Sequence, residues 1–141
     1  MIFLDTNIFI YHLADDPHFG EMADKVFSLI EEGKLEAHAS VISYTEILTF
    51  PAQSGKKDLI KQYAELLSHY PHLDFIDVDI TIAHEASLLR GKFPALKLAD
   101  ALILSTATSV KSKTFLTEDK RLKLKGFNIE VLSLNAFLAT L

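Results

Sequence analysis

The stretch Ile2-Phe3-Leu4-Asp5-Thr6-Asn7 decides the fold, because a short apolar run ends abruptly in three residues that favour helix starts. A continuous apolar run of this kind is typical of a buried strand. Asp, Thr and Asn are all common at helix N-caps. We therefore predict a buried strand over residues 2–4 that ends at Asp5, followed by a short helix over residues 8–13.

The rest of the chain repeats this alternation of short strands and helices. Further strands are predicted at residues 35–41, 75–78, 114–116 and 129–132. Helices are predicted at residues 19–32, 43–50, 58–69, 80–90 and 97–110, with a short helix closing the chain. Gly33, Pro51 and Gly91 mark three of the helix ends. Strands that alternate with helices predict an α/β fold with three layers, α/β/α, around a central parallel five-stranded sheet.

Composition limits the class of protein. The chain has 141 residues, of which 49% are hydrophobic and 23% are charged, so it is expected to form one globular domain over residues 1–141. The absence of cysteine excludes disulfides and thiolate metal sites, and it fits a reducing compartment. The start carries no basic segment, and no apolar run approaches the roughly 20 residues of a membrane span. We expect no signal peptide, no membrane partner and a cytoplasmic location.

The formal net charge of −5 is unusual for a protein that binds nucleic acid. Clustered acids can, however, be neutralised by bound cations that reverse the local field. Basic residues also gather in one part of the chain, at Lys111, Lys113, Lys120, Arg121, Lys123 and Lys125. Such a group is either a solvated face or a contact for phosphate, and the sequence leaves both interpretations open.

Two acidic residues follow predicted strands. Asp5 lies at the carboxyl end of the first strand, and Asp119 comes shortly after the carboxyl end of the strand at residues 114–116. Parallel sheets bind ligands outside the carboxyl ends of their strands. Each residue could instead cap the helix that follows it, and taken singly either one fits that role.

Two further acids lie within predicted helices. Ser43 and Glu46 match a capping box, in which Glu46 would reach back to the backbone N–H of Ser43, although the same position also aims the carboxylate toward the strand end. Asp100 lies in an almost wholly apolar helix, where an ionised carboxylate requires a partner. That partner is either Lys97, three residues earlier, or a divalent cation.

Carboxylates that crowd together raise one another's pKa, and a hard cation such as Mg²⁺ or Mn²⁺ relieves the repulsion. Zinc is not expected, because there is no cysteine and the six histidines show no metal-ligand spacing; we interpret them as surface or loop residues. A cation lowers the pKa of a bound water that can attack phosphorus, and a second one about 4 Å away stabilises the leaving oxygen. Thr6, Asn7 and Thr117 are expected either to orient the acids or to serve only turn chemistry.

The order and separation of these motifs resemble the PIN domain family along nearly the whole chain. The matching segments are Phe3-Leu4-Asp5-Thr6-Asn7, Ser43-x-x-Glu46, Leu98-Ala99-Asp100-Ala101 and Leu116-Thr117-Glu118-Asp119. The chain length is similar to that of the toxin half of VapBC-type toxin–antitoxin pairs.

The resemblance implies a Mg²⁺- or Mn²⁺-dependent endoribonuclease that cuts RNA, with Asp5, Asp100 and Asp119 as metal ligands and Glu46 binding directly or through water. It also implies an antitoxin partner and a homodimer, and Thr117 matches a Ser or Thr that is frequent near the last acid. Many relatives have Asn immediately before the last acid, where this chain has Glu118. That carboxylate either alters metal binding or faces solvent.

Two other functions compete with this interpretation. A hydrophobic strand that ends in Asp is also found in haloacid-dehalogenase-like phosphatases, in which Asp5 would be the nucleophile. Those enzymes have a second Asp two residues later, where this chain has Asn7, and an Asp pair where it has Glu118 and Asp119. The second alternative is a non-catalytic PIN-like RNA-binding module, although all four acids are present.

Overall fold

Five parallel strands form one sheet in the computed structural model, which describes residues 1–141. Their order across the sheet is β3-β2-β1-β4-β5, and Phe3 of the central strand pairs with His38 on one side and Phe115 on the other. The strands are β1 (Ile2–Leu4), β2 (Ala37–Ser40), β3 (Leu73–Ile76), β4 (Thr114–Leu116) and β5 (Glu130–Leu132). The predicted five-stranded parallel sheet is confirmed.

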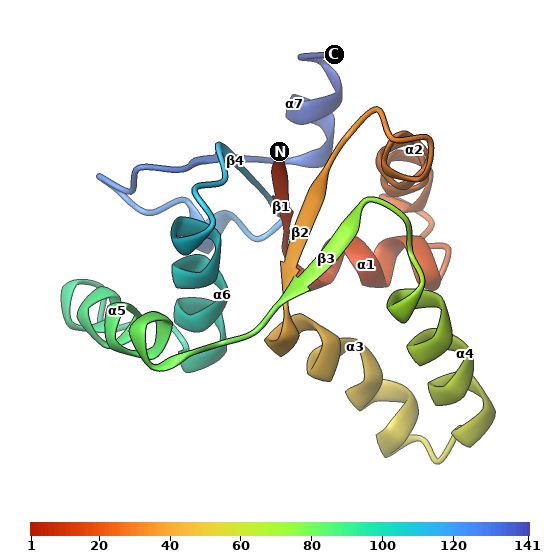
Figure 1. The fold of residues 1–141 in the computed structure, drawn as a ribbon. Helices are drawn as coiled ribbons and strands as arrows, with labels where there is room; N and C mark the ends of the chain where they lie inside the picture. Colours follow the sequence, from red (N-terminus) through yellow and green to blue (C-terminus); the bar gives the residue numbers. More distant parts are fainter.

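Helices cover both faces of this sheet (Figure 1). They are α1 (Thr6–Leu13), α2 (Gly20–Glu31), α3 (Val41–Gln53), α4 (Lys57–Ser68), α5 (Ile80–Lys92), α6 (Leu98–Ser109) and α7 (Leu134–Leu138), with a 3₁₀ helix η1 (Lys120–Leu122) after β4. Helices α5 and α6 lie on one side, and α1 and α2 lie on the other. This arrangement is the predicted three-layer α/β/α fold.

Two apolar cores result, one on each face of the sheet, because neighbouring side chains of a strand point in opposite directions. Ile2 and Leu4 pack with α1 and α2, whereas Phe3 stacks on Phe115 at a centroid distance of 5.9 Å beneath α6. Phe9 and Phe137 are buried in the first core. These two side chains therefore belong to the interior, whereas Ile10, next to Phe9, is 43% exposed.

Several element boundaries differ from the predictions. Helix α3 begins at Val41, two residues early, because Ser40 caps it by accepting a hydrogen bond from the backbone N–H of Ile42 at 3.1 Å. Pro51 lies inside its last turn, where the fixed φ of proline suits a helix and only one backbone hydrogen bond is lost. Gly91 likewise lies inside α5. Strand β3 is two residues earlier than predicted, and α1 begins at Thr6 instead of residue 8.

None of the helices combines the length and apolar character that crossing a lipid bilayer would require.

Candidate functional site

The chain reverses its direction of travel across the sheet between β1 and β4. After β1 it builds β2 and β3 on one side, and it then returns to place β4 on the other side of β1. Parallel sheets bind ligands at such a switch point, outside the carboxyl ends of the two strands. Asp5 follows β1 directly, and Thr117 follows β4 directly. The backbone N–H of Asp5 donates to the carbonyl oxygen of Leu116 at 3.0 Å, so the two strand ends are held together.

Asp5 is the most buried acid of the site, and the residue is only 5% exposed. Its Oδ1 accepts a hydrogen bond from the backbone N–H of Thr6 at 2.8 Å, and its Oδ2 accepts one from the Thr117 hydroxyl at 2.7 Å. Burial raises the pKa of Asp5 to about 6, with smaller upward contributions from Asp100 and Glu46 and opposition from the two hydrogen bonds. Asp5 caps α1 and faces the other acids at the same time, so the two interpretations of this residue do not exclude each other.

Thr117 joins both strand ends through one hydroxyl group. It donates its proton to Asp5, and its oxygen accepts from Asn7 Nδ2 at 3.2 Å and from the backbone N–H of Asp119 at 3.0 Å. The Oδ1 atom of Asn7 is buried without a hydrogen-bond partner. Thr117 thus fixes the orientation of Asp5 and the course of the chain toward Asp119.

Glu46 does not form the capping box, because the N-cap of α3 is Ser40 and Ser43 lies inside the helix. One turn into α3, the Glu46 carboxylate accepts a hydrogen bond from the hydroxyl of Thr6 at 2.6 Å. The same hydroxyl is hydrogen-bonded to the fully buried Ser43 hydroxyl at 2.8 Å. Ser43 therefore helps to hold Thr6, which binds Glu46, and the helix-capping role that the sequence suggested for Ser43 is wrong.

Asp100 lies in the first turn of α6 and is half-buried. Its carboxylate makes no ion pair with Lys97, so the salt bridge considered from the sequence is not formed. Burial raises the pKa of Asp100, and the neighbouring Asp119 and Glu46 add to the effect, while Lys97 and Arg121 oppose it. The influence of these acids on Asp100 shows that residues from α3, α6 and the β4–η1 loop share one region.

Asp119 has a different environment. Its Oδ1 accepts from the backbone N–H and from Nε of Arg121, both at 3.0 Å, and its Oδ2 accepts from a terminal guanidinium nitrogen at 2.7 Å. The bonds from the Arg121 side chain keep the pKa of Asp119 below its usual value. This partner was not predicted, although its position two residues after the acid, within a basic group, was the available signal.

The Glu118 carboxylate does not join the other acids and binds the start of α7. Its Oε1 accepts a hydrogen bond from the backbone N–H of Leu134 at 2.7 Å, at the start of α7. A carboxylate is favourable there because the first N–H groups of a helix lack intrahelical partners. The departure from the family pattern therefore has a structural role.

The four acids surround a common region without enclosing a preformed ion site. No three acidic or histidine side chains lie close enough together to hold a single metal ion. No histidine bonds to any of the four acids; the histidine–carboxylate contacts are His12–Asp24, His38–Asp74 and His72–Glu36. His38 does not fit the expectation of a surface or loop residue, because it lies in β2 with a buried Nδ1.

The PIN domain family model matches residues 2–128, and the chain belongs to this family. The fold is similar to that of VapBC2 from Rickettsia felis bound to a promoter DNA fragment, with a TM-score of 0.73 and 21% identity over 94% of this chain and 98% of that chain. It is also similar to DNA-bound VapBC from Salmonella typhimurium, with a TM-score of 0.74 and 18% identity over 94% and 97% of the two chains.

A third similar structure is VapC20 from Mycobacterium tuberculosis, described as a sarcin–ricin loop cleaving toxin, with a TM-score of 0.68 and 16% identity over 90% and 96% of the two chains. No curated protein matches the chain by sequence. The family match favours the PIN domain over the dehalogenase-like alternative.

Proposed function

We propose that this chain is a metal-dependent endoribonuclease that hydrolyses RNA phosphodiester bonds with Mg²⁺ or Mn²⁺. The proposal is carried by the contacts that link the four acids. Thr6 binds both Asp5 and Glu46, Thr117 binds Asp5 and the backbone of Asp119, and Arg121, which holds Asp119, lines the same cavity as Asp100. The electrostatic environment is the second support, because burial raises the pKa of both Asp5 and Asp100 and the neighbouring acids add to the rise.

The residues present fit a hard divalent cation in their chemistry. All donors are carboxylate oxygens, which Mg²⁺ and Mn²⁺ prefer, and no sulfur or imidazole competes. A cation would also offset the repulsion among the acids, which adds to the effect of burial on the pKa of Asp5 and of Asp100. Arg121 bonds to both oxygens of Asp119, and Oδ2, which accepts only one of these bonds, keeps a lone pair that could bind a cation.

The divalent cation would supply Lewis-acid chemistry and activate water for attack on phosphorus. The chain itself would position the ligands. Thr117 and the backbone N–H of Thr6 hold the two oxygens of Asp5, and the Thr6 hydroxyl holds Glu46. Asn7 acts through Thr117, to which it donates a hydrogen bond. Such partners orient ligating groups and typically change metal affinity or activity about 10- to 100-fold when removed.

Cleavage of a panel of RNA molecules in the presence of Mn²⁺ tests the proposal. The Asp5→Asn variant should lose activity by at least about a hundredfold, because it removes a ligand together with its charge. Asp58→Asn is the matched control, since Asp58 lies exposed in the first turn of α4. Equal cutting by wild type and Asp5→Asn would reject the site, and an absence of cutting on every RNA would favour a non-catalytic binding module.

We further propose that the chain is the toxin of a toxin–antitoxin pair, that an antitoxin protein binds it, and that it forms a homodimer. The similar VapBC structures match the chain over nearly its whole length, which supports this proposal. Expression in a bacterial host should arrest growth, and Asp5→Asn should relieve the arrest. Co-expression of the product of an adjacent short reading frame should also relieve it. Growth that is unaffected by the wild-type chain would reject the toxin role.

The dimer proposal has its own test. Ile80 and Leu98 are 85% and 58% exposed at the first turns of the packed helices α5 and α6. We propose that these two exposed apolar side chains contribute to the dimer interface. Light scattering of the wild type should give a dimer, and Ile80→Glu should shift it toward a monomer. A wild-type chain that stays monomeric at every concentration would reject the homodimer.

A further inference from the structure

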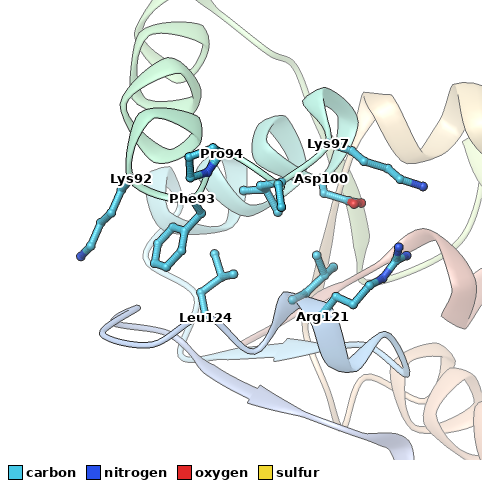
Figure 2. A pocket seen from close by; sticks show the side chains of 10 residues that line it. Lys92, Phe93, Pro94, Lys97, Asp100, Arg121 and Leu124 are labelled. Atoms are coloured by element: carbon cyan, nitrogen blue, oxygen red, sulfur yellow. The ribbon is translucent and has the colours of Figure 1, made fainter.

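A cavity of about 380 Å³ lies beside the acidic site, between the loop that joins α5 to α6 and the segment that follows β4. This volume falls within the range of about 300–1,000 Å³ that is usual for small-molecule pockets. Figure 2 shows Phe93, Pro94 and Leu124 at one end of the cavity and Lys97, Asp100 and Arg121 at the other. An apolar end therefore leads directly to a charged end.

The charged end is shared with the acidic site. Asp100, one of the four acids of the site, lines the cavity. Arg121 also lines the cavity while its guanidinium holds Asp119. A molecule with an anionic group at this end would have that group next to the four acids and the rest of its body in the apolar part.

The apolar end offers one flat aromatic surface in a fixed position. Phe93 is partly buried, because it packs against the core beneath α6. The Nζ atom of Lys92 lies 5.5 Å from the centre of its ring. A ring that is held by the core and accompanied by a cation suits a flat heteroaromatic ligand that carries hydrogen-bond acceptors.

The charge on the cavity wall is opposite to that of the chain. Three of its lining residues are cationic, Lys92, Lys97 and Arg121, and Asp100 is the one anionic residue. Arg121 is paired with Asp119 outside the lining, so Lys92 and Lys97 are the cations without an ion-pair partner. The whole chain carries a formal net charge of −5. A local positive surplus in an acidic protein is complementary to phosphate, which accounts for most of the affinity of proteins for nucleic acid.

We propose that this cavity binds one unpaired base of the RNA, next to the phosphate that is cut, with the base stacked on Phe93. This inference rests on the proposed nuclease function and deepens it by assigning this cavity to the base next to the cut phosphate. A base in a duplex cannot enter such a cavity, because it must first leave the stack. Stacking on an aromatic ring tolerates all four bases, so the cavity selects unpaired nucleotides more than a particular sequence.

Lys97 and Arg121 have a positioning role in this arrangement. Both cations lie at the mouth of the cavity near Asp100, where the sugar–phosphate backbone of a bound strand would pass. They can contact phosphate oxygens on either side of the base, which fixes the strand without reading its sequence. The base in the cavity then sets which phosphate lies beside the acids.

The first test uses nucleotides alone and needs no catalysis. The methyl signals of Leu124 in the full chain should shift in NMR spectra when adenosine, cytidine, guanosine or uridine 5′-monophosphate is added. Ribose 5-phosphate, which lacks a base, should leave these signals in place. Leu124 signals that ignore all four nucleotides would overturn the inference, as would signals that respond equally to ribose 5-phosphate.

The second test is a cycle of RNA and protein changes, measured as kcat/KM. The RNA is an oligomer that the protein cuts, in which each base near the cut is replaced in turn by an abasic residue. At one position, loss of the base should lower the wild-type rate about tenfold, in keeping with the measured strength of base–aromatic stacking. Phe93→Leu should show the same loss on the intact RNA and no further loss on the abasic RNA.

Two variants guard this experiment. Phe50→Leu is the matched control, because Phe50 is 65% exposed in α3 and does not line the cavity, and it should behave as the wild type does. Leu124→Ala probes the opposite wall and should repeat the effect of Phe93→Leu. If the loss of kcat/KM caused by Phe93→Leu and the loss caused by the abasic residue are independent at every position, no base stacks on Phe93 and the inference fails.

Failure of this inference can be told apart from failure of the nuclease proposal. RNA cleavage that depends on Asp5 but shows no coupling between Phe93 and any base would overturn only the base cavity. Nucleotide binding at Leu124 in a chain that cuts no RNA would overturn the nuclease proposal and leave the cavity as a nucleotide site. Protection of Leu124 by a partner protein, with no response to nucleotides, would assign the cavity to a peptide and overturn the inference.

Discussion

Asp5 and Asp119 follow neighbouring strands, yet their surroundings are opposite. Asp5 is buried, which raises its pKa to about 6 even though two hydrogen bonds from neutral donors oppose the rise. Asp119 is more open and is held by a guanidinium, which lowers its pKa. The comparison shows that buried neutral groups position Asp5, whereas the exposed guanidinium of Arg121 positions Asp119. Thr117 contacts both, through the side chain of Asp5 and the backbone of Asp119.

The largest expected effect comes from removing that shared contact. Thr117→Val keeps the shape of the side chain but leaves Asp5, Asn7 and the backbone N–H of Asp119 without a common partner. Because these groups are buried or partly buried, the free energy of unfolding should fall by about 3 kcal/mol. Chemical denaturation measures this change. Thr117→Ser retains the hydroxyl and should lose far less; equal losses in the two variants would show that the methyl group and not the hydroxyl matters.

The second effect is the pH dependence of stability in the presence of a chelator. The unfolded chain releases the Asp5 proton near pH 4, whereas the folded chain keeps it to about pH 6. Between these values the folded state binds more protons, so raising the pH lowers the contribution of Asp5 to stability by about 2 kcal/mol. Asp119 has the opposite sign, and its contribution is lost as the pH falls below its usual pKa.

Unfolding of the wild type and of Asp5→Asn across pH 4 to 7 separates the contribution of Asp5. The difference in stability between the two proteins should shift in favour of the variant as the pH rises, since the variant has no proton to release. A difference that stays constant over this range would mean that Asp5 ionises normally in the folded chain.

The third effect is stabilisation by metal. Mn²⁺ at ten times its dissociation constant should stabilise the chain by about 1.4 kcal/mol, because it binds the folded state only. At a fixed Mn²⁺ concentration the effect should be larger at pH 7.5 than at pH 5, since the proton on Asp5 must leave before the cation binds. Thermal unfolding with Mn²⁺ and with a chelator measures it, and Asp58→Asn should respond as the wild type does. A shift that survives in Asp5→Asn would place the cation elsewhere.

The smallest effect on stability should come from Arg121→Gln, because exposed ion pairs contribute little. This variant sharpens the comparison in another way. The pKa of Asp119 should rise when its guanidinium partner is removed, while the pKa of Asp5 should stay nearly unchanged. NMR titration of the two carboxyl groups measures both, and Lys120→Gln is the control of equal charge change. Equal movement in Arg121→Gln and Lys120→Gln would show that general charge, and not the specific pair, sets the pKa of Asp119.

Much of the fold could be predicted from the sequence, because strand runs such as residues 2–4 are buried on both faces and their apolar pattern is unambiguous. The sheet edge that carries Asp5 and Thr117 could be predicted for the same reason. Boundaries that depend on a single cap could not be placed as well. Ser40 and Ser43 are both suitable caps for α3, and only the packed structure decides between them.

The contacts among the acids were less predictable than their positions. The sequence offered Glu46 a partner three residues away and Asp100 a partner at Lys97, yet Glu46 bonds to Thr6, forty residues earlier in the chain, and Asp100 forms no ion pair. Local spacing identifies candidate partners within one helix. It does not reveal competition from a hydroxyl that the fold brings in from a distant segment, as it does for Thr6.

The bond between Glu118 and the start of α7 has a consequence for the whole loop after β4. Three consecutive residues fasten three different segments: Thr117 binds the end of β1, Glu118 binds α7, and Asp119 binds η1. The loop therefore connects β1, α7 and η1, and a movement of one of these segments acts on the contacts of the other two. Displacement of α7 would leave the Glu118 carboxylate without its partner directly beside Asp119, so a change at the end of the chain would place an unpaired negative charge next to the proposed site.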